Sequence, residues 1–204
     1  MNRLTESELA INPRDTGLAP FEMETLFGNT NPVVLEIGSG KGRFLLATAM
    51  ERPDVNVLGI EKSLHYHRVI RNRFLKRDLR NVRLINHDAF VVLQKMIPDA
   101  SVAEVHIYFP DPWPRKRERK RRIIRPEVLA ELKRVLVEGG SGIYVTDHEE
   151  YFESAAPLVE EAFARTERRI PGPDDPPRTN YEAKYREEGR AIFEIRFWRS
   201  KSEV

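Results

Sequence analysis

The stretch Val33-Val34-Leu35-Glu36-Ile37-Gly38-Ser39-Gly40-Lys41-Gly42 decides the fold of this chain. Its first five residues form a mostly apolar run rich in β-branched side chains, which is typical of a buried strand. A glycine-rich turn follows, and we expect a helix over residues 41–50. This order of strand, glycine turn and helix is typical of the first unit of a parallel α/β domain that binds a ligand against the turn.

The rest of the chain continues the alternation of strand and helix, which predicts a parallel sheet covered by helices. Ser63 is a candidate cap for the second helix, Gly139-Gly140 is expected to end a later one, and Asp147 with Glu150 resembles a capping box. We expect residues 1–31 to form a short N-terminal segment and residues 32–204 a single domain. The expected strands are 33–37, 56–60, 82–86, 102–109, 142–146 and 191–198, the last of them antiparallel, and the expected helices are 41–50, 64–76, 89–97 and 126–137.

The composition excludes several classes of protein. The chain has 204 residues and 40% hydrophobic residues, enough for one packed domain, and it has no cysteine for a disulfide or a thiolate metal site. His65 and His67 diverge on a helix and the other histidines stand alone, so no metal site is expected. No apolar run reaches the length of a membrane span, and we expect a cytoplasmic protein with no membrane contact.

Three acidic residues follow successive expected strands. Glu36 opens the glycine turn, Glu61 ends the second strand, and Asp88 ends the third. Each one alone is more often a helix cap than a ligand contact, but together they mark the edge where open α/β sheets bind ligands. The third glycine of the turn comes one residue too early for the G-x-G-x-x-G pattern of dinucleotide enzymes. A carboxylate such as Glu36 repels a pyrophosphate and attracts a sulfonium, which favours S-adenosylmethionine over NAD.

The segment Phe109-Pro110-Asp111-Pro112-Trp113-Pro114 follows the fourth expected strand, and its prolines exclude a helix. Asp111 is either a turn-forming residue or a carboxylate held at the ligand edge, where it can accept hydrogen bonds from guanine while the base stacks on an indole. Residues 115–125 then carry a net charge of +7 in a chain of net charge +2, so the rest of the molecule carries −5. Such a run is by default a solvated surface, but beside a reactive edge it favours a polyanionic partner.

Together these motifs resemble the bacterial tRNA (guanine-N7-)-methyltransferase family over about residues 32–198. The matching pieces are Val34–Gly42, Gly59-Ile60-Glu61, Asn86-His87-Asp88-Ala89, Phe109–Pro114, Thr146-Asp147, Arg178–Glu182 and the stretch Lys184–Gly189. The resemblance implies a Rossmann-like class I methyltransferase fold, with a mostly parallel seven-stranded sheet, helices on both faces and a late antiparallel strand. It further implies S-adenosylmethionine as cofactor, tRNA as partner and guanosine 46 of the tRNA variable loop as the methylated nucleoside.

The resemblance also implies roles for individual residues. Asp111 corresponds to the catalytic position. The family has a substrate-contacting lysine four residues after the aspartate, where this chain has Arg115 followed by Lys116, so either side chain can serve. The cofactor-contacting residues are Glu36, Gly38, Gly40, Gly42, Glu61, Asp88 and Asp111, the substrate-contacting residues are Arg115, Asp147, Thr179, Asn180, Tyr181 and Glu182, and the RNA-contacting residues are Trp113, Lys116, Arg117, Arg119, Lys120, Arg121 and Arg122.

Two other readings remain open at this stage. Asp111-Pro112-Trp113 is faintly similar to the motif of enzymes that methylate a base amino group in nucleic acid. A non-catalytic RNA-binding module on the same scaffold is the other alternative, and it predicts a disrupted cofactor pocket. The chain is expected to act as a monomer or a homodimer without an obligate protein partner.

Overall fold

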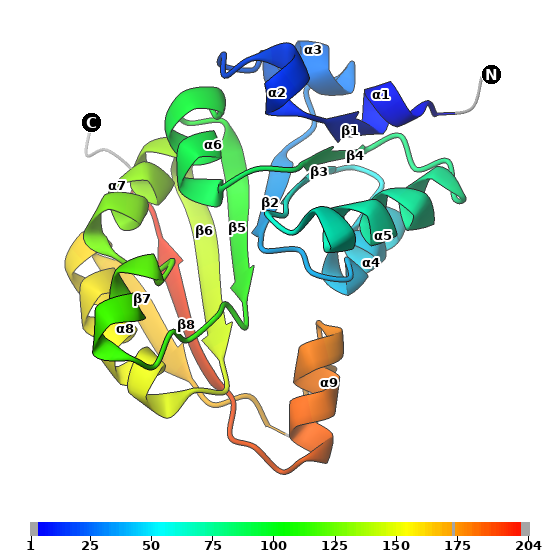
Figure 1. The fold of residues 1–204 in the computed structure, drawn as a ribbon. Coiled ribbons are helices and arrows are strands. Elements are labelled where there is room, and N and C mark those ends of the chain that lie inside the picture. Colours follow the sequence, from blue (N-terminus) through cyan, green and yellow to red (C-terminus); the bar gives the residue numbers. More distant parts are fainter. Residues whose placement is uncertain (1–3, 173, 201–204) are drawn as a thin grey trace.

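A mixed sheet of eight strands runs through the part of the chain that the computed structural model describes, residues 4–172 and 174–200 (Figure 1). The strand order is β1-β4-β3-β2-β5-β6-β8-β7. Strand β8 is antiparallel to both of its neighbours, and every other pairing is parallel. The strands are β1 (Ala10–Ile11), β2 (Val33–Ile37), β3 (Asn56–Ile60), β4 (Val82–Ile85), β5 (Val102–Tyr108), β6 (Leu136–Thr146), β7 (Arg165–Arg169) and β8 (Phe193–Trp198).

Helices cover both faces of this sheet, as predicted. Strand β2 shows why: Leu35 packs in the core cluster formed with α6, α7 and α8, whereas Val34 packs in the cluster formed with α4 and α5. Because neighbouring residues of a strand face opposite sides, a strand covered on both faces is apolar throughout. The helices are α1 (Glu6–Leu9), α2 (Pro13–Thr16), α3 (Met23–Phe27), α4 (Arg43–Glu51), α5 (Leu64–Leu75), α6 (Ala89–Met96), α7 (Pro126–Val135), α8 (Glu149–Ala162), α9 (Asn180–Glu187) and the 3₁₀ helix η1 (Lys116–Arg121).

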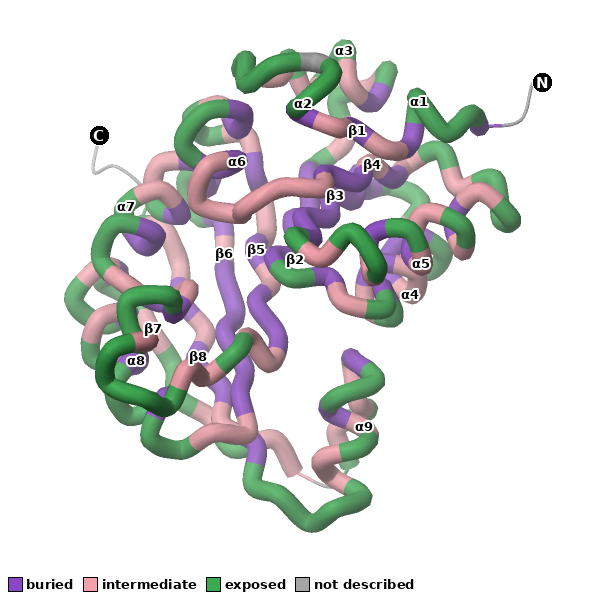
Figure 2. The backbone as a smooth tube through the Cα atoms, in the orientation of Figure 1, coloured by how far each residue is buried: buried purple, intermediate pink, exposed green. Residues whose placement is uncertain are grey.

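Figure 2 shows that burial is concentrated along the central strands, while the outer turns of the helices are exposed. The expected strands at 33–37 and 56–60 are confirmed residue for residue, and Ser63 caps α5 by accepting a hydrogen bond from the amide of Tyr66. The late antiparallel strand is also confirmed, with Tyr144 of β6 opposite Ile195 of β8. The described helices include none with both the length and the apolar character that a bilayer crossing demands.

The sheet has one strand more than the seven expected. The additional strand is β1 of the N-terminal segment, where Ala10 pairs with Leu84 and Ile11 with Ile85 of β4. Two residues are too few to show a periodic pattern, so strand β1 could not be predicted from the sequence. Leu9 and Phe27 of the same segment are buried in the two core clusters.

The expected boundary between the helix 126–137 and the strand 142–146 was wrong. Helix α7 ends at Val135, and β6 begins at once at Leu136, so that Gly139-Gly140 lie inside the strand, at a bulge where the pairing with β5 shifts between Val102 and Glu104. A Cβ at Gly140 would lie 2.8 Å from the carbonyl oxygen of Val137, so the bulge admits only glycine there without a shift.

The cap of α8 is His148, whose Nδ1 accepts the amide hydrogen of Tyr151, and not Asp147. The Asp147 carboxylate instead pairs with Arg190, at 2.8 Å. Asp147, which was expected to cap α8, therefore presents its carboxylate to the loop that contains Arg190.

Candidate active site

The glycine turn lies directly after β2, at the carboxyl edge of the sheet. Gly38, Gly40 and Gly42 all have positive φ, between +51° and +76°, which side chains with a Cβ rarely adopt. A Cβ at Gly42 would also lie 2.9 Å from Cγ2 of Ile70, so this glycine is required for close packing of the turn against α5. The backbone of the turn is therefore fixed in an open, ligand-facing form by both conformation and packing.

Glu61, at the end of β3, holds this turn from the neighbouring strand. Its Oε2 accepts the amide hydrogen of Gly40 at 2.8 Å, and its Oε1 accepts that of Ser63 at 2.7 Å. Burial raises the pKa of Glu61 above the usual range, although these amide donors oppose the effect. The carboxylate links two strand ends through their backbones.

Glu36 is the unsatisfied group of the site. Its side chain is buried, with 3% of its surface exposed, and its Oε2 has no hydrogen-bond partner among the described residues. Burial, and then the nearby negative charge of Glu61, raise the pKa of Glu36 well above its usual value. A buried carboxylate in this position gains most from a cation brought to it.

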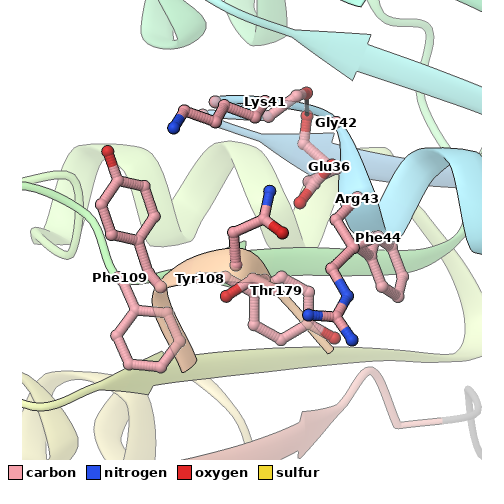
Figure 3. Close-up of a pocket in the computed structure, with 13 residues that line it drawn as sticks. Glu36, Lys41, Gly42, Arg43, Phe44, Tyr108, Phe109 and Thr179 are labelled. Atoms are coloured by element: carbon pink, nitrogen blue, oxygen red, sulfur yellow. Dashed lines mark hydrogen bonds between the residues drawn. The ribbon is translucent and has the colours of Figure 1, made fainter. Parts of the chain in front are cut away.

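A cavity at the glycine turn brings together three parts of the chain that are distant in sequence (Figure 3). The turn and the start of α4 form one side, the end of β5 another, and the N-terminus of α9 the third. Helix α9 lies beyond the carboxyl end of the sheet (Figure 1). The lining residues are Glu36, Gly38, Ser39, Gly40, Lys41, Gly42, Arg43, Phe44, Tyr108, Phe109, Thr179, Asn180 and Tyr181.

Asp111 lies close to this cavity, on an exposed loop. Its negative charge contributes to raising the pKa of both Glu61 and Tyr181, which places it within electrostatic range of the cofactor-side acids and of α9. Glu36, Glu61 and Asp111 are therefore electrostatic neighbours, but of the three only Glu36 lines the cavity, and ligand contact by Glu61 and Asp111 stays a prediction.

Asp88 has a different environment. Its Oδ1 caps α6 by accepting the amide hydrogens of Phe90 and Val91, at 3.0 and 3.4 Å, and its Oδ2 pairs with Lys62 at 3.1 Å. It is not among the residues that line the cavity. The helix-cap role that the sequence left open for this residue is the one observed here, and its contact with the cofactor stays a prediction.

Some of the residues expected to contact substrate line the cavity, and Glu182 is buried behind them. Thr179, Asn180 and Tyr181 line the cavity, and Thr179 also caps α9 by accepting the amide hydrogen of Glu182 at 3.0 Å. The Glu182 side chain is fully buried behind them.

The buried Glu182 belongs to an ion-pair network that fixes α9. Its Oε1 lies 2.9 Å from Arg178 and 2.6 Å from Arg186, and Arg178 also reaches Glu194 of β8 at 2.6 Å. Because a buried carboxylate needs such partners, this network anchors the third wall of the cavity to the antiparallel strand.

The basic segment after the Asp111 loop is mostly solvated, with one exception. Arg115, Lys116, Arg117, Arg119, Lys120 and Arg121 are exposed; Arg119 pairs with Glu150 at 3.0 Å, and the Arg121 guanidinium lies over the Trp113 ring at 4.8 Å. Arg122, by contrast, is buried among protein groups and has no free face for RNA.

Several cavity residues were not anticipated from the sequence. Lys41, Arg43 and Phe44 follow the glycine turn, and Tyr108 and Phe109 end β5. One signal was present for the last two, because an aromatic pair at a strand end directly before a proline cannot continue into a helix and must lie at the edge of the sheet.

Comparison with known proteins agrees with this geometry. Phosphoethanolamine N-methyltransferase 2 of Haemonchus contortus, solved with S-adenosylhomocysteine, superposes with a TM-score of 0.61 at 14% identity, over 88% of this chain and 51% of that one. A family model described as "Putative methyltransferase" matches residues 30–195. The fold and the site thus define a Rossmann-like methyltransferase that depends on S-adenosylmethionine.

Sequence relatives give the particular family. The tRNA (guanine-N(7)-)-methyltransferase of Actinobacillus pleuropneumoniae is 35% identical, over 87% of this chain and 74% of that protein. The protein of the same name from Aliivibrio salmonicida is 39% identical, over 86% of this chain and 76% of its own length. The chain belongs to the bacterial tRNA (guanine-N7-)-methyltransferase family.

Proposed function

We propose that this protein transfers a methyl group from S-adenosylmethionine to N7 of a guanosine in the variable loop of tRNA. The observation that carries the proposal is the buried Oε2 of Glu36, which has no hydrogen-bond partner within residues 4–172 and 174–200, in a cavity shared by the glycine turn and α9. When bound, S-adenosylmethionine supplies a methyl group activated by its positively charged sulfur. We further propose that the protein acts in the cytoplasm, as a monomer or a homodimer, without an obligate protein partner.

The residues of the first half of the edge fit a cationic, adenosine-containing cofactor. Glu36 lacks a partner that a cation would supply, and the glycines of the turn leave the backbone open to close approach. Glu61 fixes that backbone through Gly40, and we propose that its carboxylate also binds the ribose hydroxyls, as the acid at this strand end does in Rossmann-like folds. Asp88, at the next strand end, is proposed to accept a hydrogen bond from an adenine amino group, in exchange for its pair with Lys62.

Asp111 is proposed to act on the acceptor base. N7 of guanine has an in-plane lone pair and no proton to lose, so the reaction needs no strong general base. The base gains positive charge as it accepts the methyl group, and a carboxylate held beside it stabilises that charge. The same carboxylate can accept hydrogen bonds from N1–H and the amino group, which orients the base for in-line attack.

The second half of the edge is proposed to hold the tRNA. Asp147, Thr179, Asn180, Tyr181 and Glu182, with Arg115 or Lys116, are proposed to contact the nucleoside, Glu182 by holding α9 in place. Trp113 offers an aromatic face, and the exposed basic residues of η1 can neutralise backbone phosphates. The target guanosine must leave its stack to reach the cavity.

The test is incubation of the protein with an unmodified tRNA transcript and methyl-labelled S-adenosylmethionine, followed by nucleoside analysis. We expect the label in 7-methylguanosine. Borohydride reduction and aniline cleavage, which break RNA at that nucleoside, should then cut the transcript within the variable loop.

Other outcomes would overturn the proposal. Label in a methylated amino group of adenine would assign a base-amino methyltransferase. Binding of tRNA without any transfer, and without binding of the cofactor, would assign a non-catalytic RNA-binding module.

A further inference from the structure

The loop 110–114, which carries Asp111, has little capacity to fix its own backbone. Three of its five residues are prolines without an amide hydrogen, so only Asp111 and Trp113 can donate from the main chain. Neither of these amides donates to another described residue. Phe109 and Trp113 also have positive φ, at +49° and +42°, and such conformations persist only where surrounding contacts impose them.

Arg122 supplies the hydrogen bond that this loop lacks. Its Nε donates to the carbonyl oxygen of Pro112 at 2.8 Å, and among the described residues it is the only group that makes a hydrogen bond to the loop. Pro112 is the residue directly after Asp111. A fixed Pro112 carbonyl together with the fixed φ of proline leaves the Asp111 backbone little freedom.

The other end of the Arg122 guanidinium is held by α8. Its Nη2 pairs with Oε2 of Glu150 at 2.6 Å and its Nη1 donates to Oγ of Ser154 at 2.8 Å. The guanidinium carbon lies 4.5 Å from the centre of the Tyr151 ring. Only a planar guanidinium can donate in these three directions at once and stack on a ring, so lysine is not equivalent here.

This contact joins the two loops that carry the acids proposed to hold the guanosine. Asp111 follows β5, whereas Asp147 follows β6 and stands two residues before the first turn of α8, which contains Glu150. Arg122 therefore fixes the distance between the ends of two adjacent strands. With only 5% of its surface exposed, it cannot at the same time contact a phosphate of the tRNA.

We propose that Arg122 is a positioning residue for methyl transfer: it fixes the Asp111 loop on α8 and so sets where the Asp111 carboxylate meets the acceptor base. This inference rests on the role proposed above for Asp111. It removes Arg122 from the RNA-contacting residues, although the neighbouring Arg121 and Lys120 remain among them.

The decisive experiment compares Arg122→Lys with Arg121→Ala under single-turnover conditions. Because a displacement of about 1 Å at a reacting group costs on the order of 100-fold in rate, we expect Arg122→Lys to lower the methylation rate roughly 10- to 100-fold. Its tRNA affinity and the dependence of that affinity on salt should stay unchanged. Arg121→Ala should show the opposite pattern in binding, with weaker and less salt-dependent tRNA affinity.

A double-mutant cycle tests whether Arg122 acts through Asp111. In an Asp111→Asn background, Arg122→Lys should cost less than about 3-fold, because the group that it positions is already absent. The proposal would be overturned if the rate reductions of the two single variants multiplied fully in the double variant. It would also be overturned if Arg122→Lys lost tRNA affinity and salt dependence together with rate.

A control separates positioning from general stability. Arg134, on α7, also donates to two backbone carbonyls and pairs with two carboxylates, but it lies where α7 runs into the amino end of β6. Arg134→Lys should lower the melting temperature without slowing methylation. Should Arg122→Lys fail to fold, Glu150→Gln breaks the same pair from its more exposed side and should slow transfer about 3- to 10-fold. Because Glu150 also pairs with Arg119, Arg119→Gln is the matched control and should not slow transfer to the same extent at saturating tRNA.

A readout without catalysis keeps this inference distinct from the proposed function. Replacing Trp198 by Phe leaves Trp113 as the single tryptophan of the chain. In that background Arg122→Lys should make Trp113 fluorescence easier to quench with acrylamide, whereas Arg134→Lys should not. Unchanged quenching would refute the positioning role, while absence of methylation by the wild type would refute only the proposed function.

Discussion

The carboxyl edge of the sheet has two halves that hold their acids in different ways. In the half formed by β2 and β3, Glu36 and Glu61 are buried, and Glu61 is bound by the amides of Gly40 and Ser63. In the half formed by β5 and β6, Asp111 lies on an exposed loop and Asp147 is bound by the side chain of Arg190. We call these the cofactor half and the acceptor half.

The difference fits the ligands that we propose for the two halves. Backbone amides are fixed by the sheet itself, so the cofactor half is organised before a small ligand arrives, which lowers the cost of binding. Arginine side chains can change partners, and Arg190 can release Asp147 when a nucleoside enters. A macromolecular substrate such as tRNA has its own shape, and side chains that can move allow the acceptor half to adapt to it.

The largest expected effect is a loss of methylation rate when Asp111 of the acceptor half is changed. Asp111→Asn should leave cofactor affinity unchanged but lower the methylation rate about 100-fold or more, because the charge that stabilises the transition state is lost. Single-turnover kinetics and calorimetry of S-adenosylhomocysteine binding measure the two quantities. Asp54→Asn, which changes an exposed acid before β3, is the control; a nearly normal rate for Asp111→Asn would remove this residue from catalysis.

The second largest expected effect is a loss of cofactor affinity when Glu61 of the cofactor half is changed. Glu61→Gln replaces a carboxylate that binds two amides, and hydrogen bonds to a charged group contribute about 1.5–3 kcal/mol. We expect the affinity for S-adenosylhomocysteine to fall roughly 10-fold or more, with tRNA affinity unchanged. Glu51→Gln, at the exposed end of α4, should change neither, and equal loss in both variants would contradict a specific role for Glu61.

A smaller effect concerns the acceptor half and salt. Replacing Lys116, Arg117, Lys120 and Arg121 together by alanine should weaken tRNA binding about 10-fold at physiological salt and reduce the slope of log affinity against log salt by up to about 4. Filter binding over a salt titration measures both. A variant with alanine at the exposed Lys95 and Lys133 removes two positive charges instead of four, and a fall in its slope of half that size would reduce the basic segment to a solvated surface.

The smallest effect is on stability. Because burial raises the pKa of Glu36 in the folded protein, ionisation of this group costs stability as the pH rises above the usual glutamate value of 4.5. Glu36→Gln should therefore melt a few degrees higher than the wild type at pH 7, since about 1 kcal/mol shifts the melting temperature by 2–4 °C in a chain of this size. The difference should vanish well below pH 4.5, where the carboxyl group of the wild type is protonated in both the folded and the unfolded state. A lower melting temperature for the variant at pH 7 would show that the carboxylate is stabilising without ligand.

The cofactor half was more predictable from the sequence than the acceptor half. A buried strand, a glycine turn and an acid at the next strand end are local patterns, and Glu36, the glycines and Glu61 all lie where the sequence placed them. Asp88 shows the limit, because a helix cap and a ligand contact use the same residue at the same position. The bulge at Gly139-Gly140 depends on its pairing with β5 and was missed. The cap of α8 was assigned to Asp147, whose carboxylate pairs instead with Arg190 in the loop before β8, and the neighbouring His148 caps the helix.

The acceptor half depends on contacts that sequence patterns do not encode. Arg122 is one of eight basic residues within eleven positions, and nothing local distinguishes it from Arg121, yet one is buried and the other solvated. The difference is imposed by Glu150 and Ser154 on a helix about thirty residues later. Helix α9 was likewise not anticipated, because its ion-pair network joins residues of two separate elements.

The anchoring of α9 to β8 has a consequence for the order in which the molecule matures during translation. The glycine turn, Tyr108 and Phe109 leave the ribosome well before Thr179–Tyr181, and the ion pair that ties the third wall to the sheet forms only after Glu194 has been synthesised. A nascent chain shorter than this point has an incomplete pocket and should not retain S-adenosylmethionine. We therefore expect the protein to retain its cofactor only late in synthesis, when the antiparallel strand β8 has joined the sheet.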